Sequence, residues 1–361
     1  MPDFAVPIEQ IVEDWPTVKK RWEAFWDHGL YDRPLIQVRA PRAAEESRRE
    51  SVDPETQWTD NSHVLRRTVE NLMTTYHGGE ALPWCWNPMS AAYALLFGCQ
   101  PHFSPATMFV DPAPASEGAF PTLDGWRATP WWAWMRQGTE MFVDASKGRF
   151  FVPVFWGNSA MDILGLVRGV ERFMMDIALN PDWVKSATAA MNRIEWEIFD
   201  ELLEIASPEA VGIEGTVETC GFWAPGKART FDADLAYCIS GRSFKELILP
   251  PMVEWMHAVD YRSWHLDGVG NLTHLETLLD LPELQAIQWV QGDGPNKPIA
   301  PWVSLIQTIQ AGGKSVQVIC EAHEVEPLLA EVRPEGLTIS TYCATEAEAR
   351  DLLMRVERLY R

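Results

Sequence analysis

The sequence predicts a single α/β domain in which eight strands alternate with helices, as in a (β/α)8 TIM barrel. Three observations support this fold. Short apolar or β-branched runs alternate with longer amphipathic segments, and no low-complexity linker interrupts them. The 361 residues, 47% of them hydrophobic, also suffice for one large core. We therefore assign residues 1–361 to one domain, with residues 1–33 as an N-terminal extension and residues 78–148 as an insertion near the barrel mouth.

Eight runs have the length and composition of strands. In order along the chain they are residues 35–40, 107–110, 150–155, 211–215, 262–266, 286–290, 315–320 and 337–341. The second run is the least regular, because residues 78–148 are rich in Pro, Gly and Trp and resemble a long excursion more than a strand–helix unit. Such insertions often form the wall or lid of a site.

Helix-like segments separate these runs. They are residues 64–76, 170–179, 181–205, 243–259, 271–279, 301–311, 325–332 and 346–360. The last one has a clear start, because Thr345 is a good N-cap and acidic residues follow it in the first turn. Gly312 and Gly313 end the helix before the seventh strand.

Charge and composition exclude several classes of function. The 30 basic and 51 acidic residues give a net charge of −21, which repels nucleic acid and anionic membranes. No run approaches the roughly 20 apolar residues of a membrane span, and the first residues do not resemble a signal peptide. We therefore expect a cytoplasmic protein. The six cysteines are scattered without a CxxC pair, which argues against a disulfide framework.

Potential metal ligands follow several predicted strands, at the barrel end where active sites lie. His265 and Asp267 are two residues apart, so both side chains of an extended segment point to the same face. Cys343 follows the eighth strand. An imidazole, a carboxylate and a thiolate are the ligands of a catalytic zinc with one open position. Alternatively, His265 is a hydrogen-bonded structural residue and Asp267 holds the turn before Gly268.

Two further carboxylates lie near strand ends. Glu214 closes the fourth predicted strand, where it could act as a fourth ligand or a general base. Alternatively, it forms a salt bridge with Arg229 or Lys227. Asp234 lies in the segment FDADLAYCIS and is a candidate for moving a proton.

The chain contains 18 tryptophans, which is unusually many for a globular protein. Flat aromatic walls suit a planar ring or a methylated ammonium group. The alternative is a hydrophobic cluster beneath a long loop. At the end of the sixth strand, Trp289 and Gln291 are candidates for cofactor binding. The other tryptophans of interest are Trp84, Trp86, Trp131, Trp132, Trp134, Trp156, Trp223 and Trp264.

Several long segments resemble the uroporphyrinogen decarboxylase superfamily, in particular its corrinoid-dependent methyltransferase-like branch. The resemblance covers most of residues 20–355, and the pairing of HLDG with IQW is its most specific part. It is carried by RWEAFWDHGLYDRPLIQVRAP, MDILGLVRGVERFMMDIALNPDWV, DADLAYCISGRSFKELILP, WHLDGVGNLTHLETLLDLPELQAIQWVQGDGPNKP and TISTYCATEAEARDLL. It implies a single (β/α)8 barrel with a site in its mouth.

Methyltransferases of this superfamily bind zinc through a His-x-Cys pair and a later Cys, which correspond to His265, Asp267 and Cys343. Here the middle ligand is a carboxylate. This harder ligand makes zinc more Lewis acidic and better suited to an oxygen or nitrogen substrate than to a thiol. The decarboxylase itself is a poorer match, because only Arg33, Arg39 and Arg42 stand near its arginine-rich substrate motif.

The resemblance implies a zinc-dependent methyltransferase that binds a small methylated substrate among the tryptophans. The methyl group would pass to or from a corrinoid (cobalamin) carried by a separate protein, while Glu214 or Asp234 moves a proton. One alternative is a metal-free, decarboxylase-like lyase in which Asp234 or Asp267 stabilises positive charge on the substrate. Another is a non-catalytic barrel that binds a corrinoid or a partner subunit. A homodimer is compatible with each of these.

Overall fold

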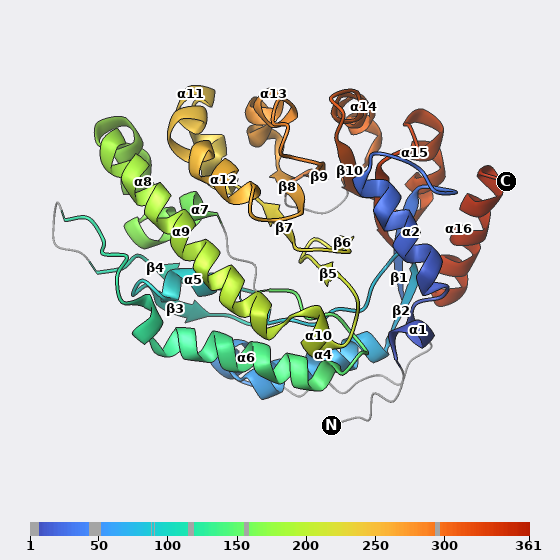
Figure 1. The fold of residues 1–361 in the computed structure, drawn as a ribbon, viewed down its shortest axis with the longest axis horizontal. Helices are drawn as coiled ribbons and strands as arrows, with labels where there is room; N and C mark the ends of the chain where they lie inside the picture. The colour runs from blue at the N-terminus through green and yellow to red at the C-terminus, as the bar shows by residue number, and fades with distance from the viewer. Residues whose placement is uncertain are drawn as a thin grey trace.

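The computed structural model has a mixed α/β fold built around one seven-stranded sheet (Figure 1). It describes residues 7–42, 52–87, 89, 91–114, 119–154, 159–292 and 297–361. The strand order is β2-β1-β11-β10-β9-β8-β7, and the strands run parallel except for β2, which is antiparallel to β1. The strands of this sheet are β1 (Leu35–Pro41), β2 (Thr75–Gly79), β7 (Ala228–Phe231), β8 (Tyr261–Asp267), β9 (Ala286–Val290), β10 (Ser315–Ile319) and β11 (Leu337–Tyr342).

Two short antiparallel pairs lie outside the main sheet. They are β3 (Gln100–Phe103) with β4 (Met108–Asp111), and β5 (Thr216–Val217) with β6 (Trp223–Ala224).

Helices cover the outer side of the sheet, where α9 and α12 to α16 follow one another around it (Figure 1). The α-helices are α1 (Ile8–Ile11), α2 (Trp15–Trp26), α3 (Pro54–Thr59), α4 (Asn61–Met73), α5 (Ala92–Leu95), α6 (Pro130–Ser146), α7 (Ala160–Arg168), α8 (Val170–Leu179), α9 (Pro181–Ile205), α10 (Pro208–Val211), α11 (Gly241–Ser243), α12 (Leu249–Met256), α13 (Leu275–Leu279), α14 (Val303–Ala311), α15 (Val325–Glu331) and α16 (Glu346–Leu359). Short 3-10 turns are η1 (Trp126–Ala128), η2 (Asp234–Cys238), η4 (Val269–His274), η5 (Ala300–Trp302) and η6 (Ala322–Glu324), and η3 (Phe244–Ile248) is a π-helical turn.

The two faces of the sheet differ in polarity because successive side chains of a strand point to opposite sides. Apolar residues such as Ile287, Val318 and Ile339 form the outer face and are buried with the helices in the main core. The inner face carries buried polar residues that bond to each other across strands. Gln37 donates to Thr338, and the hydroxyls of Thr230 and Ser263 lie 2.7 Å apart.

An aromatic cluster covers the end of the sheet where the parallel strands begin. Phe25 and Trp26 of α2 pack against Phe222, and the Trp26 indole donates to the Trp223 carbonyl. The first residues of β1, β7 and β9 belong to the same cluster. This end is therefore occupied by side chains, which leaves the carboxyl ends of the strands for a site.

Five predicted strands are confirmed as β1, β8, β9, β10 and β11. The prediction for 107–110 was wrong in its placement, because these residues contribute β4 to a separate hairpin. Residues 150–154 contain only the isolated bridge Trp84–Phe151, residue 155 lies outside the described ranges, and 211–215 contains no strand. The α/β class with a parallel sheet is thus confirmed, while a closed eight-stranded barrel stays a prediction.

The helix predictions were accurate where the amphipathic pattern was long. Helices α8 and α9 begin and end at the predicted residues. The predicted helix 243–259 is divided into α11, η3 and α12, because Pro250 and Pro251 lack the amide protons that a continuous helix needs. Among the described residues, no helix combines the length and apolarity that a membrane crossing requires.

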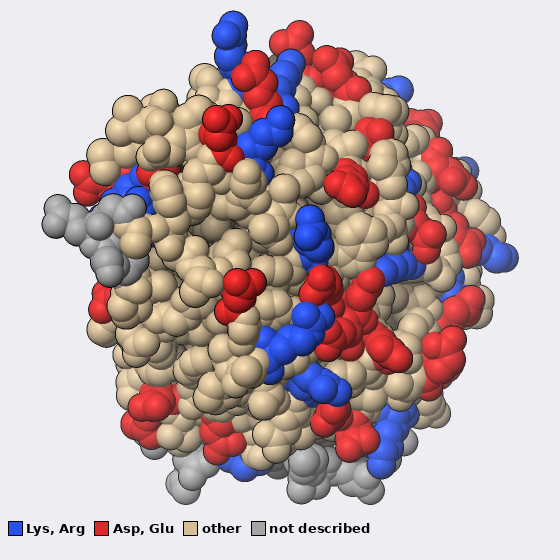
Figure 2. Space-filling view, turned by 60° about the vertical axis from the view of Figure 1, so that its left-hand side comes forward, with Lys and Arg blue, Asp and Glu red and all other residues tan. Residues whose placement is uncertain are grey.

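Acidic and basic side chains are interspersed on the surface. On the face shown in Figure 2, lysines and arginines lie singly or in small groups beside acidic residues, and the described residues form no broad basic area there.

Candidate functional site

Asp234, His265 and Asp267 form a compact cluster at the carboxyl ends of β7 and β8. Each offers a potential metal-ligand atom, and these atoms all lie within 4.8 Å of one another. His265 and Asp267 share the inner face of β8, whereas Trp264 and Leu266 point to the buried outer face. The spacing in the sequence thus places the imidazole and this carboxylate side by side.

Asp234 reaches the cluster because a buried carboxylate holds the turn that carries it. Asp162, in the first turn of α7, accepts hydrogen bonds from the amides of Asp234 (3.0 Å) and Leu235 (2.7 Å). Ser159 caps α7 and donates its hydroxyl to Asp162. Asp162 is therefore a positioning residue.

A second side chain ties the two strand ends together. The amide group of Asn271, in η4, donates to the backbone carbonyls of both Asp267 and Asp234. Gly268 has φ +74°, which lets the chain turn sharply after β8 so that Asn271 can reach back. The two acidic residues are thus fixed relative to each other through their backbones.

Both acidic residues contain a carboxylate oxygen that is buried without a partner. Oδ1 of Asp234 and Oδ1 of Asp267 have no hydrogen-bond partner within the described structure. Buried polar atoms are nearly always satisfied, and a missing ion is one standard reason for an exception. These atoms indicate a site built for a ligand.

The electrostatics of the cluster lead to the same conclusion. Burial, together with the nearby Asp162 and Asp267, raises the pKa of Asp234 to about 7. Burial also raises the pKa of Asp162 and of Asp232. Burial lowers the pKa of His265, so its imidazole is neutral at neutral pH and has a lone pair to donate. A cation would offset the repulsion among the carboxylates.

The donor atoms fit a divalent metal ion. Imidazole nitrogen and carboxylate oxygen both bind zinc, with bonds of about 2.0–2.2 Å, so two ligand atoms of a tetrahedral ion lie about 3.3–3.6 Å apart. The three atoms of the cluster lie within 4.8 Å of one another, and side-chain rotations would bring them to this separation. Three protein ligands also leave a coordination position for substrate.

Cys343 does not belong to this set of atoms. It follows β11, on which Thr338 and Ser340 hydrogen-bond on the inner face. Its amide donates to the Arg39 carbonyl. The charges of Glu348 and Arg355, both on α16, act on the pKa of its buried thiol. Burial raises the pKa of that thiol, which disfavours the thiolate that metals bind. Its role as a ligand stays a prediction, and Asp234 is the third residue that the structure brings to the cluster.

The remaining candidates lie at different places. Glu214 has a 65% exposed side chain and pairs with Lys19 of α2, instead of the expected Arg229 or Lys227. Trp289 points to the outer face and packs against Trp302 with ring centres 4.8 Å apart, so Gln288 is the inward residue of β9. Gln291 follows β9, and its side-chain nitrogen is buried without a partner in the described structure.

The tryptophans of the excursion pack in close pairs and against the protein core, Trp132 within the main core and Trp84 against the aromatic cluster at the other end of the sheet. Trp126 and Trp132 meet edge to face at 5.0 Å, as do Trp131 and Trp134 at 5.7 Å. Trp84 and Trp86 are 6.5 Å apart. Trp156 lies outside the described residues.

Exposed apolar side chains surround the carboxyl ends of the strands. Tyr237 and Val269 follow β7 and β8, and Ile319 and Tyr342 are the last residues of β10 and β11. Their exposed fractions are 59%, 59%, 47% and 60%. Apolar groups at such a place suit a ligand or partner that covers them.

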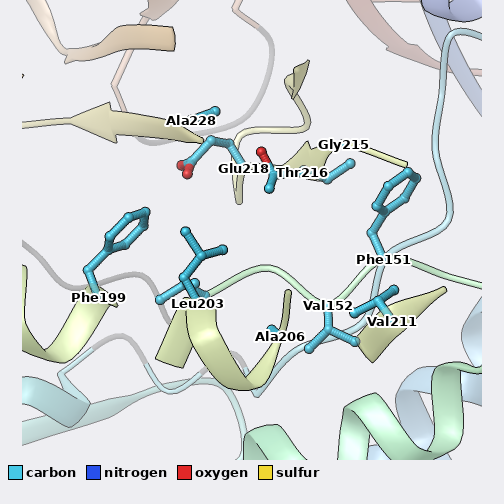
Figure 3. A pocket seen from close by; sticks show the side chains of 12 residues that line it. Phe151, Val152, Phe199, Leu203, Ala206, Val211, Gly215, Thr216, Glu218 and Ala228 are labelled. Atoms are coloured by element: carbon cyan, nitrogen blue, oxygen red, sulfur yellow. The ribbon is translucent and has the colours of Figure 1, made fainter. Parts of the chain in front are cut away.

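A separate small pocket lies between α9 and the β5–β6 hairpin (Figure 3). Phe199 and Leu203 line it from α9, and Glu218 and Thr216 from the opposite side. One Glu218 oxygen accepts the Thr230 amide, so this carboxylate already has a partner. The pocket and the cluster share no residue.

No protein-family profile matches the chain, and no curated protein matches it. Among solved structures, a methyltransferase from Methanosarcina mazei is similar with a TM-score of 0.59 and 12% sequence identity. The match covers 95% of this chain and 98% of that chain. At this identity, the similarity shows that the two proteins share a fold.

Asp162, Asn271 and Gln288 contribute to the site but were missed in the sequence. Gln288 could have been predicted, because it is the polar residue in the middle of the apolar run 286–290 and therefore indicates which side of that strand faces the site. Asp162 carries a weaker indication, a Ser-x-x-Asp start of a helix. The two backbone amides that donate to it are 72 and 73 residues away, which no local pattern reveals.

Proposed function

We propose that this protein is a methyltransferase that holds a zinc ion with Asp234, His265 and Asp267. The observation that carries the proposal is the pair of unpartnered carboxylate oxygens beside a neutral imidazole. The fold shared with a methyltransferase along nearly the whole chain supports it. A closed (β/α)8 barrel would place this cluster inside the mouth.

The residues of the chain have separate roles in this proposal. When bound, zinc supplies a Lewis acid that polarises the methyl-bearing heteroatom of the substrate. His265 and the two carboxylates fix the position of that charge, and Asn271 keeps the carboxylates at a constant separation. With two oxygen ligands, the site favours an oxygen or nitrogen substrate over a thiol.

We further propose that the methyl group passes to or from a corrinoid carried by a separate protein. The apolar side chains of Tyr237, Val269, Ile319 and Tyr342 support an encounter at this end of the sheet, because covering them removes apolar surface from water. The substrate would then be a small methylated compound held between the cluster and this surface.

Metal content and methyl transfer test the proposal together. The purified protein should contain one zinc per chain by elemental analysis. With reductant and cob(I)alamin it should form methylcobalamin from a methylated amine or ether, detected by visible absorption. Asp234→Asn should lose the metal and the activity, while Glu214→Gln should retain both. A protein without zinc whose methyl transfer ignores chelators would refute the metal site.

Cys343→Ser separates two ligand sets. If the thiol is a ligand in place of Asp234, as the family resemblance implies, Cys343→Ser loses zinc and Asp234→Asn retains it. If Asp234 takes that place, Asp234→Asn loses zinc and Cys343→Ser retains it.

A metal-free lyase is the second candidate, and the pKa of Asp234 is the observation that favours it. A carboxyl with a pKa of about 7 can serve as a general acid and base at neutral pH without a metal. In this case decarboxylation of a pyrrole-type substrate would persist in EDTA and disappear in Asp234→Asn.

A further inference from the structure

A row of hydrogen bonds crosses the inner face of the sheet and ends on His265. His265 Nδ1 lies 2.5 Å from Oε1 of Gln288 on β9. Gln288 Nε2 donates to Oε1 of Gln317 on β10 at 2.7 Å. Gln317 Nε2 donates to the backbone carbonyl of Cys220 at 3.1 Å. Three strands and the β5–β6 connection therefore contribute to one continuous row.

The direction of this row is fixed by its far end. A backbone carbonyl can only accept, so the Gln317 group that faces Cys220 is its NH2. The Gln317 oxygen then faces Gln288 and requires a donor, which places the Gln288 NH2 on that side. The Gln288 oxygen is left facing His265, so Nδ1 of His265 must carry the proton.

Burial makes the alternative arrangement costly. Gln317 is fully buried, and Gln288 is 5% exposed. Turning either amide over would place two acceptors or two donors face to face without water to separate them. Leaving a buried polar group unsatisfied is strongly unfavourable. The observed arrangement is thus favoured at each link.

We propose that Gln288 and Gln317 are positioning residues that hold His265 in its Nδ1-protonated tautomer. The lone pair of the neutral imidazole then lies on Nε2, the nitrogen that binds zinc in our proposed function. Partners that fix a ligand histidine in this way tune metal affinity by about 10–100-fold. The metal role of the row rests on the proposed function, whereas the tautomer does not.

Nitrogen NMR of the metal-free protein tests the tautomer directly. In 15N-histidine-labelled protein at pH 8, long-range correlations separate the two tautomers, and the His265 signal is the one missing from His265→Gln. The wild type should show the Nδ1-protonated form. A wild type with the proton on Nε2 would overturn the proposal, whether or not any variant folds.

Variants test the roles of the glutamines. Gln288→Met and Gln317→Met keep the volume but remove the hydrogen bonds, and both should shift His265 towards the Nε2-protonated form. Gln37→Met is the matched control, because Gln37 is a buried inner-face glutamine that bonds to Thr338 instead. An unchanged tautomer in both test variants, or an equal change in the control, would overturn the proposal.

Zinc titration of the same proteins connects the row with the metal. Affinity should fall by about 10–100-fold in Gln288→Met and remain unchanged in Gln37→Met. Equal affinities in these two variants would overturn the metal role of the row. A wild type that shows the expected tautomer but binds no zinc would refute the proposed function while leaving the tautomer assignment intact.

Discussion

Replacing Asp234 by Asn should stabilise the metal-free protein at alkaline pH. The pKa of Asp234 is raised from its ordinary value of 3.8 to about 7 in the folded protein. The unfolded chain therefore releases this proton at a lower pH than the folded protein does, so the folded wild type loses stability as the pH rises from about 4 to about 7. One pKa unit corresponds to roughly 1.4 kcal/mol, so the shift lowers the free energy of unfolding by about 4 kcal/mol at most. This is an upper limit because part of the shift comes from repulsion that the neighbouring carboxyls share.

The Asn side chain has no charge to lose, so the gain of the variant depends on pH. It should approach about 4 kcal/mol at pH 8, be about 1–2 kcal/mol at pH 5, and vanish below pH 4. Urea unfolding of EDTA-treated protein at these pH values measures it. Zinc at a hundred times its dissociation constant should stabilise the wild type by about 2.7 kcal/mol and the variant far less.

Glu214→Gln is the control, since it removes an exposed carboxylate without affecting the cluster. A variant no more stable than wild type at pH 8 without metal would refute the electrostatic reasoning. Equal stabilisation of both proteins by zinc would refute the assignment of Asp234 as a ligand.

Three further changes test the surrounding structure. Asp162→Ala removes the acceptor for two backbone amides, at a cost of about 1–3 kcal/mol each, and should weaken zinc binding in a titration. Arg229→Met leaves Glu195 buried without its cation and should cost about 3–5 kcal/mol in urea unfolding, partly recovered when Glu195→Gln is added. Gly79→Ala would place a Cβ 2.1 Å from the Ile36 carbonyl oxygen, so its thermal midpoint should fall well below that of Gly125→Ala, which also has a positive φ but meets nothing within 4 Å.

The sequence predicts those parts of the fold in which one face of an element is regularly apolar. Helix α9 and the β8–β11 strands were located correctly for this reason. Strand β7 was missed because its sequence ARTF contains a buried arginine, and Arg229 forms an ion pair with Glu195 on α9. A contact with a residue 34 positions away leaves no trace in the local pattern.

The candidate site follows the same rule. The two-residue spacing of His265 and Asp267 was sufficient to place both in the cluster. The same alternation applied to β9 indicates Gln288 as the inward residue, although Trp289 was chosen for its chemistry. The approach of Asp234 could not be predicted, because it depends on Asp162 and Asn271, which lie on other elements.

The row of amides that ends on His265 also constrains how the protein matures. Gln317 lies 97 residues after Cys220, and both must be in place before the row has a direction. During synthesis, His265 leaves the ribosome long before β10 does. A nascent chain therefore cannot yet orient this imidazole, and in our proposal the tautomer of His265 that binds zinc is fixed only after β10 has been synthesised.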